Sequence, residues 1–215
     1  MKRFLISFGC VFLVMGQVAW AQFSKPSYSL SPMEKDTLAS RCKYLRDEIA
    51  KLQKSPKGAE VNMADLYVYI SAAEINLKQD LFFTLQTYKQ SLTLLDICET
   101  KIAYFSSVGG KIKVQTGLIN CGYQSAIDRS YQPYQLFIPE SFPFKTNTPQ
   151  QIEVFLHGRM GNVNEIGFLS SRGTVSSAFG PTKPDHIVLF PFGRGNNGWR
   201  YAGEQDVIEA LADVC

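Results

Sequence analysis

Apolar residues recur at helical spacing through the first half of the chain. Ser31, Pro32 and Glu34 form a helix start signal, with an N-cap, a proline in the first turn and a glutamate placed for a capping box. The apolar positions that follow are spaced four and three residues apart, so they line one face: Leu38, Cys42, Leu45, Ile49 and Leu52. The pattern predicts a helix that ends near residues 55–58.

Two further helices are predicted before residue 110. Asn62 is expected to cap the second helix, and Asp80 is expected to open the third, which Gly109 and Gly110 terminate. The apolar faces are Leu66, Ile70, Ala73 and Leu77 in the second helix, and Leu81, Leu85, Tyr88, Leu92, Leu95, Cys98, Ile102 and Phe105 in the third. Together the three amphipathic helices predict an all-helical N-terminal region over residues 31–108.

The second half of the chain changes to a strand-and-helix alternation. Residues 111–119 and 131–138 carry strand-forming residues with a turn at 128–130 between them. Apolar strands are predicted at 152–157 and 187–190, with helices at about 163–171 and from about 204 to the end. Alternation of this kind favours an α/β fold in which helices cover a parallel sheet, here over residues 111–215.

The final helix carries an apolar face made by Val207, Ile208, Leu211 and Val214, which we expect to pack on the sheet. No capping glycine or polar tail follows it. Two parallel strands are fewer than a covered sheet normally has. We therefore expect these residues to be the N-terminal part of an α/β domain that continues beyond Cys215.

Residues 1–21 have the features of a secretory signal peptide. Lys2 and Arg3 precede an apolar run, and Ala19 and Ala21 form a small-x-small cleavage site. The run is too short to span a bilayer, so we expect an exported protein with no stable membrane span after cleavage, although an uncleaved N-terminal anchor is an alternative. Without the leader the chain has 20 basic and 19 acidic residues, a balance that does not indicate a nucleic-acid partner.

Four cysteines follow the predicted leader. They are Cys42, Cys98, Cys121 and Cys215, without CxxC or histidine spacing, so we expect no metal site. Cys42 and Cys98 both lie on apolar helix faces. Export permits a disulfide between them, and two buried thiols are the equal alternative.

A possible functional turn follows the first parallel strand. His157 and Gly158 lie where a strand ends, and ligands of α/β sheets bind at the carboxyl ends of the strands. Gly158 lets the backbone turn, and the N–H groups of Arg159 or Met160 are candidate donors to an oxyanion. We expect the His157 ring to hold the loop by hydrogen bonds rather than to act as a base. An ordinary strand-to-helix turn is the alternative.

A glycine-rich loop over residues 193–201 follows the second parallel strand. It lacks a GKS/T, and although Gly193, Gly195 and Gly198 have a GxGxxG spacing, that spacing alone is a weak signal, so a nucleotide site is not indicated. Gly195, Trp199 and Tyr201 suit a substrate-pocket wall, and a purely structural loop is the equal alternative. The acidic residues Glu204, Asp206 and Glu209 are explained by the field at the helix N-terminus, and His186 is expected on an exposed loop.

Four segments resemble a known family when taken in order. They are residues 123–134, the Leu-His-Gly-Arg run at 156–159, the Gly-Arg-Gly-Asn run at 193–196, and residues 201–210. The chain resembles exported bacterial prolyl oligopeptidase-like serine hydrolases and esterases of the α/β-hydrolase superfamily over about residues 35–215.

The resemblance implies a Ser-His-Asp triad acting on an ester or amide substrate, with no metal and no organic cofactor. It places the serine in a GxSxG elbow. No GxSxG occurs here, and both histidines precede the expected serine, so we expect the triad beyond Cys215 and no hydrolysis by these 215 residues alone. Only the oxyanion-hole role of Gly158, Arg159 and Met160 and the pocket-wall role of Gly195, Trp199 and Tyr201 carry over.

Two other functions stay open at this stage. One is an exported, non-catalytic adaptor that binds a partner through the helical region. The other is a different α/β enzyme in which His157 is the working base.

In the superfamily the nucleophile strand lies beside residues 152–157, so its absence leaves an open sheet edge that predicts aggregation of this chain alone.

Overall fold

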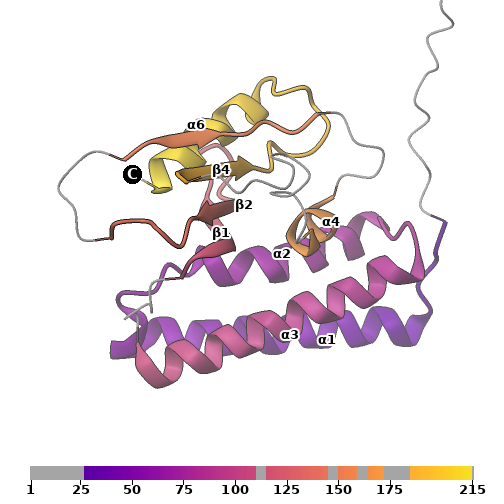
Figure 1. Ribbon diagram of the computed structural model, residues 1–215. Coiled ribbons are helices and arrows are strands. Elements are labelled where there is room, and N and C mark those ends of the chain that lie inside the picture. Colours follow the sequence, from indigo (N-terminus) through magenta and orange to yellow (C-terminus); the bar gives the residue numbers. More distant parts are fainter. Residues whose placement is uncertain (1–26, 110–114, 145–149, 159–163, 172–184, 215) are drawn as a thin grey trace, which may run out of the picture.

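The computed structural model describes residues 27–109, 115–144, 150–158, 164–171 and 185–214, which form a mixed α/β fold. Three long helices form one layer, a small sheet lies beside it, and α6 covers the other side of the sheet (Figure 1). The elements are α1 (Pro32–Lys54), a 3₁₀ turn (Pro56–Gly58), α2 (Ala64–Gln79), α3 (Leu85–Val108), β1 (Gly117–Gln124), β2 (Tyr131–Ile138), β3 (Ile152–Val154), α4 (Glu165–Ser170), β4 (Ile187–Pro191) and α6 (Ala202–Val214).

Helix α1 follows its sequence signals closely. The Ser31 Oγ accepts a hydrogen bond from the Glu34 N–H at 3.3 Å, and the Glu34 carboxylate accepts one from the Ser31 N–H at 2.8 Å. This is the reciprocal capping box that the sequence predicts. The five apolar positions predicted for its inner face are all buried.

The predicted start of the third helix is wrong by several residues. Asp80 ends α2 in a left-handed conformation with φ +54°, and its N–H donates to the Asn76 carbonyl. Thr84 caps α3 instead, since its Oγ1 accepts from the Thr87 N–H at 3.3 Å. Aspartate tolerates the left-handed region better than most residues, so a residue that resembles a helix start here serves as a helix end.

The four strands form one sheet in the order β1-β2-β4-β3. Strand β2 runs antiparallel to β1 and β4, and β3 runs parallel to β4, which confirms the parallel pair. The predicted bounds of β2 are confirmed. The strand predicted at 111–119 is misplaced, because β1 spans Gly117–Gln124, while residues 111–114 lie outside the described part; β3 is shorter than predicted.

The helical layer closes the outer edge of β1. The Asn120 carbonyl accepts from the Lys101 ammonium at 3.2 Å, and the Gly122 N–H donates to the Asp65 carboxylate at 2.8 Å. The Asn62 amide donates to the Gly122 carbonyl at 3.1 Å, and its oxygen accepts from the Ala64 N–H. The N-cap of α2 is Met63, without a side-chain cap, so the predicted cap at Asn62 is wrong by one residue. The side chains of Lys101, Asp65 and Asn62 form hydrogen bonds with the backbone groups of β1 that another strand would need for pairing. At the opposite end of the sheet, β3 pairs with β4 alone within the described residues.

The helical layer and the α/β half share one core. Ile166, Phe168 and Leu169 of α4, together with Phe192 after β4, belong to the same buried cluster as the inner faces of α1, α2 and α3. A second cluster lies between the sheet and α6. The regions at 31–108 and 111–215 therefore pack against each other and share a hydrophobic core.

Helix α6 packs on the sheet, as predicted, but with only part of its predicted apolar face. Gly203, Asp206 and Ala210 are its buried residues, while Ile208 is 55% exposed. Leu211 and Val214 pack at the margin of the sheet cluster. The correction has a physical reason: Asp206 is held inside by polar partners described below, and this rotates Ile208 outward.

Cys42 and Cys98 are buried thiols that are not bridged. Burial raises the pKa of each to about 12. The Cys98 Sγ lies 3.5 Å from the Leu66 carbonyl oxygen, its acceptor. The structure thus adopts the two-thiol alternative.

In the described part of the chain, no helix combines the length and apolar character needed to cross a bilayer.

Candidate functional site

A cleft of about 440 Å³ lies where the parallel strands β3 and β4 end. Its walls are the turn after β3 and the loop after β4: His157, Gly158, Gly195, Asn196, Asn197, Gly198, Trp199 and Arg200. Carboxyl ends of neighbouring parallel strands meet at one edge of a sheet, where α/β proteins bind their ligands. The structure therefore brings together the two segments that the sequence singled out separately.

His157 joins the two walls of the cleft. Its Nε2 lies 3.0 Å from the Phe192 carbonyl oxygen, and its Nδ1 lies 2.9 Å from the Gly158 carbonyl oxygen. A carbonyl oxygen only accepts hydrogen bonds, and a neutral imidazole carries a single N–H, so the ring donates to one of these two carbonyls at a time. Both ring nitrogens lie against backbone carbonyl oxygens of the cleft walls. This geometry fits the loop-orienting role and disfavours His157 as a general base.

Gly158 is exposed at the mouth of the cleft. Its φ is outside the left-handed region, and a Cβ added there would meet nothing within 4 Å. The turn itself therefore does not require glycine, in contrast to the sequence-based interpretation. Arg159 and Met160, the proposed oxyanion donors, lie outside the described residues.

The loop after β4 has an unusual backbone. Gly193, Arg194, Gly195, Gly198, Trp199 and Tyr201 all have φ between +53° and +89°. Left-handed backbone at residues as bulky as tryptophan and tyrosine is strained, and such strain persists only where the surroundings hold it. The loop is therefore held in one shape by its contacts.

Trp199 provides several of those contacts. Its indole Nε1 donates to the His157 carbonyl at 3.1 Å, and the two rings lie with centroids 4.7 Å apart. The backbone N–H of Trp199 donates to the Asn197 side-chain oxygen at 2.9 Å, and the Asn197 amide donates to the Gly193 carbonyl at 2.8 Å. The six-membered ring covers Gly193 so closely that a Cβ there would lie 2.3 Å from it.

Tyr201 does not contribute to the cleft. Its side chain is 89% exposed, and it is absent from the residues that line the cavity. The pocket-wall prediction therefore fits Gly195 and Trp199, which do line the cleft, and is wrong in placement for Tyr201. The left-handed φ of +53° at Tyr201 directs its side chain to solvent at the start of α6.

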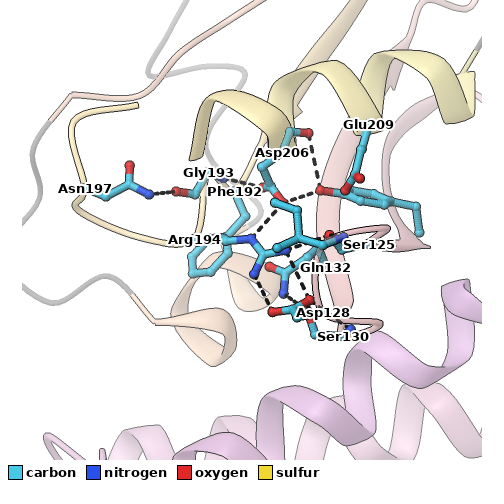
Figure 2. Close-up of polar contacts among 12 residues, drawn as sticks. Ser125, Asp128, Ser130, Gln132, Phe192, Gly193, Arg194, Asn197, Asp206 and Glu209 are labelled. Atoms are coloured by element: carbon cyan, nitrogen blue, oxygen red, sulfur yellow. Dashed lines mark hydrogen bonds and ion pairs between the residues drawn. The ribbon is translucent and has the colours of Figure 1, made fainter. Parts of the chain in front are cut away.

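A buried carboxylate on α6 holds the loop by polar contacts (Figure 2). Asp206 is fully buried and accepts hydrogen bonds from the Tyr123 hydroxyl and, at 2.8 Å, from the Gly193 N–H. The Arg194 Nε lies 3.7 Å from the same carboxylate. Burial is the largest influence on Asp206 and raises its pKa, while its hydrogen-bond partners act in the opposite direction.

Arg194 links the loop to the turn between β1 and β2. Its guanidinium donates to the Asp128 carboxylate at 2.7 Å and to the Ser125 hydroxyl at 2.8 Å. The Arg194 and Ser130 hydrogen bonds hold the pKa of Asp128 well below its ordinary value. Glu209 on α6 accepts from the Ala126 N–H of the same turn at 3.0 Å.

Sequence reasoning missed this network. Asp206 and Glu209 were assigned to the field of the helix N-terminus, but both make tertiary hydrogen bonds to residues 83 positions earlier in the chain. The signal available in the sequence was an aspartate on the apolar side of α6, next to Ala210 one turn later. A polar residue on a buried face indicates a specific partner.

His186 is less exposed than predicted. Its Nε2 lies 2.8 Å from the Glu153 carboxylate of β3, and its Nδ1 lies 3.1 Å from the Asp185 carboxylate. These hydrogen bonds raise the pKa of His186. The residue ties the beginning of β4 to β3, well away from the cleft lining.

Among the residues that the structure describes, no group of three or more His, Cys, Asp or Glu side chains is arranged to hold a metal ion. Comparisons with family models, curated proteins and solved structures find no match to this chain. The cleft presents a rigid aromatic wall, an exposed glycine turn and, among the described residues that line it, no nucleophile.

Proposed function

We propose that this chain forms the N-terminal part of an exported serine hydrolase of the α/β-hydrolase superfamily, acting on an ester or amide substrate. The observation that carries the proposal is the position of the His157-Gly158 turn. It directly follows the parallel strand β3, precedes α4, and lies across a cleft from the loop after β4. In that superfamily the loop between the corresponding strand and helix supplies one N–H of the oxyanion hole.

The arrangement of the sheet edges supports the same proposal. Lys101, Asp65 and Asn62 occupy the outer backbone groups of β1, whereas β3 is paired on one side only in the described part of the sheet. The superfamily places its nucleophile strand beside β3. Within the described residues no strand pairs with β3 on the side where the proposal needs a further one.

The proposed mechanism assigns few steps to these residues. A serine hydroxyl attacks the substrate carbonyl, a histidine takes the serine proton and an aspartate orients that histidine; none of the three lies within this sequence. The oxygen that becomes negative accepts hydrogen bonds from backbone N–H groups of the turn at 158–160. His157 holds this turn against the loop after β4, and Gly195 and Trp199 form part of the substrate wall.

The test is the protein encoded when the reading frame is followed past codon 215. We expect it to contain a GxSxG elbow followed by Asp and His, and to react with a fluorophosphonate probe at that serine. Exchange of the serine for alanine is the control and abolishes labelling. A stop codon directly after codon 215 would overturn the proposal and favour the adaptor function, and so would an extended protein that resists the probe.

Export is part of the proposal and has its own test. The leader at residues 1–21 predicts cleavage before Gln22. Mass spectrometry of the protein recovered outside the cytoplasm should give an N-terminus at Gln22, and recovery of only the uncleaved chain in the cytoplasm would contradict export.

A further inference from the structure

The charges around the cleft are unevenly satisfied. Arg194, near the start of the loop, has two carboxylates within 4 Å of its guanidinium, those of Asp128 and Asp206. Arg200, in the cleft lining, is exposed, and its side chain forms no hydrogen bond or ion pair with the part of the chain that the structure describes. The two arginines are six residues apart on the same loop, yet one is neutralised and the other is not.

No acidic side chain is among the eight residues that line the cleft. The nearby carboxylate of Asp206 is fully buried and oriented toward Tyr123 and Gly193. Asn197 uses both ends of its amide within the loop. Among the described residues that line the cleft, Arg200 is therefore a cation without a counter-ion that a ligand can use.

Trp199 adds an apolar surface beside that cation. Its ring is fixed by the hydrogen bond to His157 and by contact with Gly193, and its backbone is held at φ +58°. A fixed aromatic ring favours a flat or apolar ligand group because little side-chain freedom is lost on binding. An arginine next to it favours a carboxylate, which its guanidinium can bind with two parallel hydrogen bonds.

We infer that the cleft binds an anionic ligand that carries a carboxylate next to an aromatic or apolar group, with Arg200 as the counter-ion and Trp199 as the apolar wall. As a statement about substrate class this rests on the proposed function, in which the acid-bearing end of the substrate occupies the cleft. As a statement about binding it depends on the described residues alone.

Fluorescence of Trp199 provides the test. The chain has two tryptophans, so a Trp20→Phe background leaves Trp199 as the reporter. The 215-residue protein is titrated at submicromolar concentration with 4-phenylbutyrate and with the neutral analogue 4-phenylbutan-1-ol. We expect a saturable change with both, and about tenfold tighter binding of the carboxylate, as is typical of one charge-assisted pair. Added salt should reduce that difference.

Two charge-matched variants complete the experiment. Arg200→Gln should bring the affinity of the acid down to that of the alcohol, while Lys89→Gln, which removes one positive charge from the exposed side of α3, should keep the tenfold preference. Equal binding of both probes, no response of Trp199, or a preference that survives in Arg200→Gln would overturn the inference. Binding is measured without turnover, so a failure of fluorophosphonate labelling in the extended protein leaves this result intact.

Discussion

Asp206 joins three segments that are distant along the chain. Its carboxylate accepts from Tyr123 on β1 and from Gly193 in the cleft loop, and it lies near Arg194. A buried carboxylate of this kind is stabilising only while its hydrogen-bond partners are present. Single residues therefore determine the shape of the cleft through contacts that lie behind its surface.

Replacement of Asp206 distinguishes this network from a simple helix-terminus effect. Asp206→Ala leaves the Tyr123 hydroxyl and the Gly193 N–H without partners in a buried site, so we expect a loss of about 3 kcal/mol in the free energy of unfolding. Glu204→Ala, at an exposed position in the first turn of α6, should cost below about 1 kcal/mol. Urea unfolding measures the loss of unfolding free energy in both variants. Equal small losses would show that Asp206 acts only as a charge near the helix terminus.

Asp65 gives the stability of the fold a defined pH dependence. Burial raises its pKa from 3.8 to about 6, although Lys101 and the Gly122 N–H oppose the shift. The folded state holds the proton more tightly than the unfolded state, so this group's contribution to stability is greatest below about pH 4 and declines as the pH rises to about 6. The decline is on the order of 2–3 kcal/mol.

The Asp65→Asn variant tests that assignment. The amide oxygen can still accept from the Gly122 N–H, but the side chain no longer ionises. We expect its unfolding free energy to vary less between pH 4 and pH 7 than that of the parent, measured by urea unfolding at each pH. If the two pH profiles run in parallel, Asp65 is not the group responsible.

At the scale of elements, the close approach of α2 to β1 sets how the helical layer meets the sheet. A Cβ added at Gly122 would lie 2.3 Å from a Val68 methyl group and 2.7 Å from the Ala64 carbonyl oxygen. Backbone atoms cannot move aside as a flexible side chain can. A glycine at this position is therefore a requirement of packing between two elements, not of the strand.

Two glycine substitutions test this contrast. Gly122→Ala should lower the free energy of unfolding by about 2 kcal/mol, because α2 must shift away from β1. Gly158→Ala meets open space and should change it by less than about 0.5 kcal/mol. Thermal and urea unfolding of both variants check the prediction, and similar losses at the two positions would contradict the packing argument.

At the scale of the whole molecule, the two edges of the sheet differ. Side chains of the helical layer form hydrogen bonds with the outer backbone groups of β1. Strand β3, in contrast, has β4 as its one partner within the described residues, and Leu156 just beyond β3 is 46% exposed. An open edge with apolar residues invites pairing between molecules. The same edge is where the proposed function requires another strand.

We therefore expect the 215-residue chain alone to be poorly soluble and to leave p-nitrophenyl acetate unhydrolysed above the buffer rate. Leu156→Lys, which adds a charge at the end of the open edge, should increase the monomer fraction in size-exclusion chromatography with light scattering. Val108→Lys is a matched control, because it adds the same charge at an exposed apolar residue on the helical layer and should have a smaller effect. A soluble, monomeric parent chain would refute the prediction.

Much of the secondary structure was predictable, and much of the cleft was not. The inner face of α1, the bounds of β2 and the parallel pairing of β3 with β4 follow from residue periodicity and turn signals. The start of α3 was missed because Asp80 and Thr84 both have side chains that cap helices, and only the backbone of Asp80 distinguishes them. The contribution of Tyr201 was misjudged because its side-chain direction depends on a left-handed backbone angle.

The sequence by itself determined which residues face inward along each helix and where strands alternate with helices, because those patterns depend on neighbours three or four positions away. The tertiary structure alone decided which sheet edge is closed, which face of α6 is buried and which arginine of the loop has no counter-ion among the described residues. These features depend on partners up to 83 residues apart, such as Tyr123 and Asp206. No local pattern encodes such a pairing, because it forms only when packing brings both residues to the same buried site.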